Sequence, residues 1–230
     1  MDENQRLAAL RWAEDKAQQL FDAIEAKGLI APGRSESAVE KDIYALAARD
    51  FGVEKHWHKR IVRAGINTLT IAADNPPVID ILADDMVFID LGPVFDSWEA
   101  DVGRTYVLGD APEKHRLNAD LPRHFEKLRD HFDTHPDITG AELFTEAERL
   151  AEADGWLWGG QIAGHLVGEF PHYRIPGDKD LYRISPHNPS RMRDPDASRH
   201  RKYWILEVHL VNPDRSWGGF YERLLLPEPN

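Results

Sequence analysis

The sequence predicts a single α+β domain made of two similar halves. Helix-like segments precede strand-like segments, and the same order recurs in the second half of the 230 residues. No low-complexity stretch divides the chain, so residues 1–230 are expected to form one domain. A weak internal similarity also suggests duplication: the segments FIDLGPVFDSWEAD and ILEVHLVNPDRSW each place an acid after apolar residues and then reach a Ser-Trp pair.

In the first half, helices are expected within residues 4–52. Apolar residues recur at helical spacing over residues 4–27, and a glycine follows them. Ser37 and Glu40 have the spacing of a capping box and predict a second helix that ends near residues 51–52.

In the second half, two further helices are expected. Residues 113–134 have a helical pattern that Pro122 should interrupt. Thr139 and Glu142 form another candidate capping box, and the helix that they begin should end at Gly155.

Strands are expected after each pair of helices. Residues 60–108 contain the β-branched and aromatic segments RIVRAG, LTIAA, MVFIDLG and VGRTYVLG, and the last third contains QIAGHLVGEF, YWILEVHLV and GGFYERLLL. The polar segment 174–203 has no period and predicts a long surface loop, for which a functional role and a solvated insertion both remain open.

The composition excludes several classes of protein. The formal net charge is −12, which argues against nucleic acid or an anionic membrane as the partner. There are no cysteines, so disulfides, thiolate catalysis and thiolate metal sites are excluded, and any metal must be held by His, Asp and Glu. No apolar run reaches the roughly 18 residues of a membrane helix, and the N-terminus is too charged for a secretory signal. A cytoplasmic location is therefore expected.

Two acids lie within a predicted hairpin over residues 86–108. Asp90 ends the apolar run MVFID and Asp101 begins DVGRTYVL, eleven residues later. A turn centred on residues 95–96 would place the two carboxylates directly opposite each other on one face of the sheet.

The same arrangement is expected in a second hairpin over residues 204–226. Glu207 lies inside WILEVHL and Glu222 inside FYERLLL, with the midpoint of the pair in the turn at residues 214–215.

Such facing carboxylates need compensation, because two of them about 4 Å apart repel by roughly 4 kcal/mol at an effective dielectric of about 20. Protonation is one remedy and a neighbouring arginine, Arg104 or Arg223, is another. Divalent cations are the third, and the presence of two matched pairs favours them over a metal-free scaffold.

Histidines supplement the acids. His165 lies in the apolar segment AGHLVGEF between glycines that permit close approach, and His172 follows seven residues later. Four carboxylates with one imidazole suit a pair of ions such as Mn²⁺, Fe²⁺, Co²⁺ or Zn²⁺.

In order and spacing, these motifs resemble the pita-bread metallohydrolases, which include methionine aminopeptidase, aminopeptidase P, prolidase and creatinase. The resemblance rests on the motifs D-L-G from Asp90, D-V-G-R-T from Asp101 and G-H-L-V-G around His165, followed by Glu207 and Glu222. It covers nearly the whole chain and implies the pita-bread fold, in which two pseudo-symmetric halves surround a curved antiparallel sheet.

The resemblance also implies a role for each residue. Asp101 and Glu222 would bridge two divalent ions, Asp90 would chelate one, and His165 with Glu207 would hold the other. Glu207 would also move protons and His172 would donate a hydrogen bond to the tetrahedral intermediate, so that these two are the expected catalytic residues. The implied reaction is hydrolysis of an amide bond, such as an Xaa-Pro bond, in a short peptide or small molecule by a hydroxide that bridges the metals, and a homodimer is the family-level expectation.

The chain departs from the family around the substrate. Ala72 stands where the peptidases have a histidine, and Leu166, His209 and Phe220 also differ from the usual pattern. His56 or His58 could replace the histidine that is missing at position 72, although a surface position is expected for both. Besides peptide hydrolysis, two alternatives follow: a metal-dependent pathway enzyme acting on a modified amino acid, and a non-catalytic binding module.

Overall fold

The four α-helices lie close to the predicted positions, and strands follow each pair of helices as predicted. In the computed structural model, residues 1–226 are described. The helices are α1 (Glu3–Ala26), α2 (Glu36–Phe51), α3 (Pro112–Thr134) and α4 (Gly140–Ala153). The strands are β1 (Ile61–Ala64), β2 (Met86–Leu91), β3 (Val94–Phe95), β4 (Trp98–Glu99), β5 (Val102–Val107), β6 (Leu157–Trp158), β7 (Gly164–Val167), β8 (Tyr203–Val211) and β9 (Gly218–Leu225).

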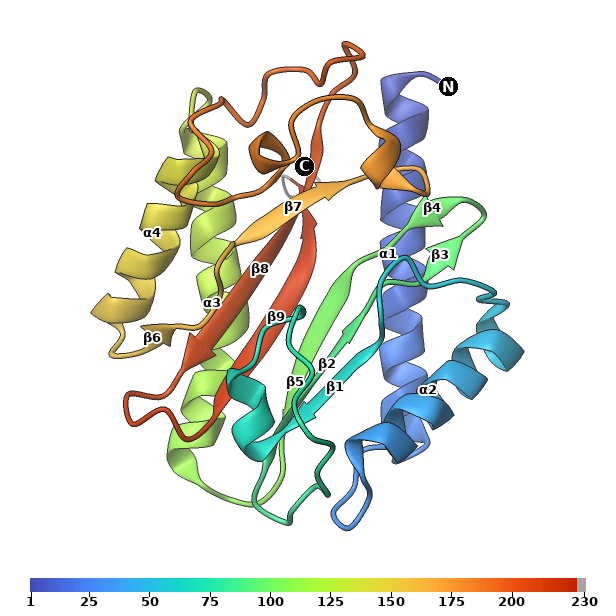
Figure 1. Ribbon diagram of the computed structural model, residues 1–230, viewed down its shortest axis with the longest axis vertical. Helices are drawn as coiled ribbons and strands as arrows, with labels where there is room; N and C mark the ends of the chain where they lie inside the picture. Colours follow the sequence, from blue (N-terminus) through green and yellow to red (C-terminus); the bar gives the residue numbers. More distant parts are fainter. Residues whose placement is uncertain (227–230) are drawn as a thin grey trace.

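One antiparallel sheet joins the two halves of the molecule. Its strand order is β1-β2-β5-β9-β8-β6, and β7 pairs with the first part of β8. Figure 1 shows α1 and α2 beside the strands of the first half, and α3 and α4 beside those of the second. This arrangement confirms the predicted α+β fold of two similar halves, which meet where β5 pairs with β9.

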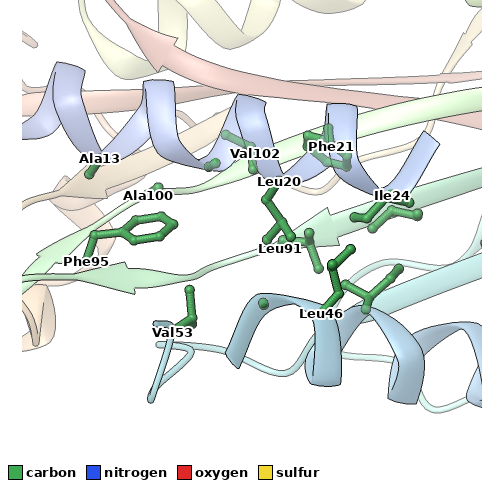
Figure 2. Close-up of a cluster of buried hydrophobic side chains, with 14 of the residues drawn as sticks. Ala13, Leu20, Phe21, Ile24, Leu46, Val53, Leu91, Phe95, Ala100 and Val102 are labelled. Atoms are coloured by element: carbon green, nitrogen blue, oxygen red, sulfur yellow. The ribbon is translucent and has the colours of Figure 1, made fainter. Parts of the chain in front are cut away.

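Each half has its own hydrophobic core. In the first, Leu20, Phe21 and Ile24 of α1 are fully buried with residues of α2 and of the hairpin strands (Figure 2). In the second, a corresponding cluster joins α3 and α4 to β8 and β9. The helices therefore pack on the sheet by apolar burial, which contributes about 25 cal/mol per Å² of apolar surface.

Two helix signals differ from the prediction. Ser35, not Ser37, caps α2, because its side chain accepts a hydrogen bond from the Ala38 amide at 3.2 Å. Pro122 lies inside α3 without ending it. The neighbouring Leu121 and Phe125 are buried in the second core, so tertiary packing holds the helix where local propensity disfavours it.

Residues 69–73 were predicted as a strand and form none. The short 3₁₀ helix Gly65–Leu69 precedes them, and its Asn67 donates hydrogen bonds to the buried Glu36. Glu36 also accepts the Ala64 amide at 2.7 Å and the Ile79 amide at 3.2 Å. This buried carboxylate holds the connection in a turn, which apolar periodicity does not reveal.

The register of the first hairpin is shifted from the prediction by two residues. Asp90 pairs with Gly103 rather than with Asp101, because the turn is centred on Asp96 and Ser97, both with positive φ. An even shift keeps the same side chains on the same face. Asp101 is therefore the diagonal neighbour of Asp90.

The second hairpin has the predicted register, with Glu207 directly opposite Glu222. The segment 174–203 is largely irregular, as expected, but it is not simply a solvated insertion. Its Ile184 and Met192 are fully buried in the second core.

Candidate metal centre

Four predicted ligands lie in or beside one row across the sheet. Asp90 of β2 pairs with Gly103 of β5, Gly103 with Glu222 of β9, and Glu222 with Glu207 of β8. Asp101 lies two residues before Gly103 and shares its face. The sheet thus places carboxylates from both halves together at the centre of the molecule.

The fifth predicted ligand, His165, reaches the same place from β7. Its Nε2 lies 2.9 Å from Oδ2 of Asp101 and 3.8 Å from Oε1 of Glu207. The other ring nitrogen, Nδ1, lies 2.8 Å from the carbonyl oxygen of Leu166. With the Nδ1–H bonded to this carbonyl, Nε2 is the nitrogen that faces the carboxylates, which is the usual orientation of a metal-binding histidine.

The arginines named as possible partners lie on the opposite face of the sheet. Arg104 donates to Glu25 and Gln18, and Arg223 to Glu14, all three acceptors on α1. Because each arginine follows a residue of the row by one position, its side chain points away from the acids. Arg104 and Arg223 therefore do not compensate the clustered carboxylates.

The donor atoms of the site fit a divalent cation. Among the described residues, Oδ1 of Asp90 and Oε2 of Glu222 are buried and accept no hydrogen bond. An unsatisfied buried carboxylate oxygen is costly unless a proton or a metal ion meets it. Two sets of three ligand atoms have the spacing of a metal site: His58, Asp90 and Asp101, and Asp101, His165 and Glu222.

Burial and mutual repulsion shift the pKa values of the acids in the absence of metal. Burial, with the charge of Asp101 adding to it, raises the pKa of Asp90 to about 7 and that of Glu207 to about 8. The same causes raise the pKa of Glu222 well above its usual range. Burial opposes ionisation of Asp101 too, but His58 and His165 beside it lower its pKa to about 2.

His58 was expected at the surface and instead lies inside the site. Its Nε2 is 3.1 Å from Oδ1 of Asp101 and 3.3 Å from Oδ1 of Asp90. It comes from the irregular segment before β1, whose pattern gives no sign of a buried histidine. His56, also expected at the surface, is half-buried beside Tyr44.

His172 lies near the centre but outside the lining of the cavity described below. Its Nδ1 is 2.5 Å from Oε2 of Glu99, and its amide donates to Oε1 of the same buried carboxylate at 2.9 Å. Its ring stacks on His165 with centroids 5.6 Å apart. The catalytic role of His172 stays a prediction, and Glu99, which sequence reasoning missed, fixes its orientation.

A cavity of about 460 Å³ opens over the acids. Besides the five predicted ligands and His58, it is lined by apolar side chains, among them Ile61, Ile71, Phe88, Ile162 and Phe220. Arg183, from the polar segment 174–203, also lines it, and its half-exposed guanidinium lies 3.3 Å from Oδ1 of Asp180. This size is typical of sites for small ligands.

The substitutions noted in the sequence differ in their relation to the cavity. Ala72, Phe220 and His209 line it, whereas Leu166 is buried in the second core. The changes at the first three positions therefore alter the surface that a substrate would meet.

The family is established by comparison with known proteins. Residues 8–194 match the model of metallopeptidase family M24, so the chain belongs to this family. The match includes Asp90, Asp101 and His165, while Glu207 and Glu222 follow it. No curated protein sequence matches the chain significantly.

Solved structures share the fold. A prolidase from Thermococcus sibiricus has a TM-score of 0.73 and 18% identity, covering 100% of this chain and 61% of that one. An X-Pro aminopeptidase from Thermotoga maritima MSB8 has a TM-score of 0.73 and 17% identity, covering 99% and 62%. A methionine aminopeptidase from Rickettsia prowazekii has a TM-score of 0.69 and 14% identity, covering 97% and 94%. The chain thus spans about three fifths of the length of the first two proteins.

In residues 1–226, no helix combines the length and the apolar character that crossing a membrane requires.

Proposed function

We propose that this chain is a catalytic domain that hydrolyses an amide bond in a short peptide, using two divalent ions. The observation that carries the proposal is the cluster of Asp90, Asp101, His165, Glu207 and Glu222 in the lining of one cavity. Buried carboxylate oxygens of Asp90 and Glu222 have no hydrogen-bond donor there among the described residues. Mn²⁺, Fe²⁺, Co²⁺ and Zn²⁺ all suit this oxygen-rich set with imidazole.

In this proposal each side chain has a definite task. Asp101 and Glu222 would be shared between the two ions, Asp90 would complete one site, and His165 with Glu207 the other. When bound, such ions supply a strongly acidified water and polarise a carbonyl group. Glu207 borders both the cavity and His165, so its carboxylate can take a proton and return it to the leaving amine.

The cavity itself favours a small substrate with a negative charge. Its apolar side chains would hold a side chain or a proline ring, and Arg183 would bind a terminal carboxylate through charge-assisted hydrogen bonds. A dipeptide, including an Xaa-Pro dipeptide, has both features.

To test the proposal, the purified protein is loaded separately with each of the four metals and incubated with a panel of dipeptides and small amides. We expect hydrolysis, followed by mass spectrometry, for wild type and a loss of at least about 10²-fold for Asp101→Asn, because the metal ligands act as a unit. Asp96→Asn in the same hairpin is the matched control, because asparagine also tolerates its positive φ. Absence of turnover with every metal would refute peptide hydrolysis.

A second function has a specific observation in its favour. Ala72 and Phe220 stand in the lining where the peptidases of the resemblance carry a histidine and, in the prolidase branch, an arginine. A metal-dependent enzyme for a modified amino acid would keep the ions and change this lining. It predicts turnover of such a compound with no cleavage of ordinary dipeptides. A non-catalytic binding module would instead tolerate Asp101→Asn without loss of function.

We propose further that the protein acts in the cytoplasm and forms a homodimer. Light scattering coupled to size-exclusion chromatography tests the dimer: a mass of about 26.3 kDa would show a monomer instead.

A further inference from the structure

His58 approaches the acids as closely as the predicted ligands approach one another. Its Nε2 lies 3.1 Å and 3.3 Å from one oxygen each of Asp101 and Asp90. Two atoms that each lie about 2.0–2.2 Å from one ion, at angles between tetrahedral and octahedral values, are separated by about 3.0–3.5 Å. Nε2 of His58 therefore lies at the distance of a fellow ligand from both oxygens, and one ligand atom of each of the three residues lies within 4.8 Å of the others.

The orientation of the imidazole ring agrees with that role. Nδ1 of His58 lies 2.5 Å from the carbonyl oxygen of Lys59, just as Nδ1 of His165 lies 2.8 Å from that of Leu166. Because the backbone carbonyl accepts a hydrogen bond from Nδ1–H, Nε2 is the nitrogen that faces the acids, where a bound cation would take the place of its proton. Both histidines thus present the same nitrogen to Asp101.

Asp101 lies between the two rings. His58 is beside its Oδ1 and His165 beside its Oδ2. A carboxylate that bridges two ions gives one oxygen to each, so the arrangement assigns one imidazole to either side of the bridge. The two separate sets of ligand atoms, one with His58 and Asp90 and the other with His165 and Glu222, follow this division.

The backbone around His58 is built to hold it there. The Trp57 amide donates to the Gly92 carbonyl at 2.8 Å, and the Val94 amide to the Lys55 carbonyl at 3.0 Å. A Cβ on Gly92 would lie 2.3 Å from Cδ2 of His58, so only glycine lets the ring pack against the end of β2. The indole of Trp57 contacts the rings of His58 and His165, with centroids 4.5 Å and 5.2 Å away.

We propose that His58 is a sixth protein ligand of the metal centre and binds, with Asp90 and Asp101, the ion that would otherwise have only carboxylates. The inference rests on the proposed function for the presence of two ions. His58 would give this ion a nitrogen donor. The site would then prefer Zn²⁺, Co²⁺ and Fe²⁺ more strongly than a site made only of oxygen ligands would.

Metal binding without any substrate tests the inference. In wild type labelled with ¹⁵N-histidine and loaded with ¹¹³Cd²⁺, we expect metal–nitrogen coupling in two imidazoles, assigned to His58 and His165 by single substitution. Coupling in His165 alone would overturn the proposal.

Affinities measured by chelator competition provide the second readout. His58→Ala should lower the affinity for one of the two ions by at least about tenfold. Removal of a residue that only hydrogen-bonds a metal ligand already costs about that much, so the loss of a ligand should cost no less. Gly92→Ala keeps the histidine but displaces its ring, so it should weaken the same ion. His56→Ala, in the same segment, is the matched control and should retain both ions. Unchanged or tighter binding of both ions by the His58 and Gly92 variants would overturn the proposal.

Circular dichroism of the metal-free variants shows whether they fold, and the cadmium spectrum of wild type does not depend on them. If wild type binds two ions but cleaves no amide, the proposed function fails and the assignment of His58 stands. If amides are cleaved and only His165 couples to the metal, the assignment alone fails.

Discussion

Asp101 belongs to both sets of candidate metal ligands, the one with His58 and the one with His165. It is 2% exposed, and its two oxygens have different imidazole neighbours. Its pKa of about 2 keeps it ionised where Asp90 and Glu207 have raised values. One carboxylate therefore stays ionised in the metal-free site, because His58 and His165 stabilise its charge.

Arg183 carries the prediction about substrate charge. Arg183→Ala should raise KM for free dipeptides about 10–100-fold, because a hydrogen bond to a charged group contributes about 1.5–3 kcal/mol. Peptides with an amidated C-terminus should be affected little, since they offer no carboxylate. Steady-state kinetics on the matched pair of substrates measures the difference. An equal effect on both substrates would exclude a carboxylate contact.

At the residue scale, the sequence reveals acids that interrupt apolar strands but not the histidine beside them. Asp90, Glu207 and Glu222 are conspicuous because a charge in a buried strand needs a reason. His58 lies in the segment HWHKR, where polar and aromatic neighbours conceal its burial. Its place depends on pairing between residues 55–57 and 92–94, a contact that no local pattern encodes.

At the scale of elements, the pairing of the strands brings the acids of both halves together around Gly103. Gly103 lies in the row between Asp90 and Glu222, and a side chain there would intrude on both neighbours in β9. A Cβ would lie 2.6 Å from the ring of Phe220 and 3.0 Å from Cβ of Glu222. The glycine thus permits the close approach of β5 and β9 at the centre of the site.

Gly103→Ala should therefore lower the free energy of unfolding by about 1–3 kcal/mol, the usual cost of overpacking, and should weaken metal binding. Gly168→Ala is the matched control, because its Cβ would meet only Cδ1 of Ile175, at an ordinary 3.8 Å. Urea denaturation and chelator competition measure the two effects. Equal stability of the two variants would contradict the proposed crowding.

The elements were predictable to different degrees for physical reasons. Helices α1 and α4 follow from periodicity and caps; the Thr139–Glu142 capping box is confirmed. The predicted register of the first hairpin was wrong by two residues. The prediction placed the turn midway between Asp90 and Asp101, whereas the positive φ angles of Asp96 and Ser97 place its centre one residue later. The length of β7 was overestimated, since only residues 164–167 pair with β8.

At the scale of the whole molecule, the fold was predictable because its two halves repeat one order of elements. Two helices and their strands build each half, and the acids of both halves meet where β5 and β9 pair. The cavity lining could not be predicted in this way, because it combines segments distant in sequence, such as Ala72, Arg183 and Phe220. The sequence therefore indicates the chemistry of the site more clearly than its substrate.

The pH dependence of stability is a property of the whole chain. Glu207 has a folded pKa of about 8 against about 4.5 when unfolded, and His58, although burial opposes it, is raised by Asp90 and Asp101 to about 10 from 6.5. A raised folded pKa stabilises the protein at low pH and stops doing so as the pH rises through that value. The metal-free protein should therefore lose stability between about pH 5 and pH 10.

Thermal unfolding across this range, with and without Zn²⁺, measures the effect. Bound metal should reduce or reverse the loss, because cations bind the deprotonated ligands and their affinity increases with pH. A metal-free protein whose melting temperature rises from pH 5 to pH 9 would contradict the prediction.

The opposite orientation of acids and arginines on β5 and β9 has a consequence for how the protein matures. Arg104 and Arg223 bind glutamates of α1 on the face of the sheet opposite the acids, so these contacts do not depend on the metal site. The chain is thus expected to complete its framework before any ion arrives, and to survive the later withdrawal of its ions by a chelator. Metal binding and release would then occur in a protein that stays folded throughout.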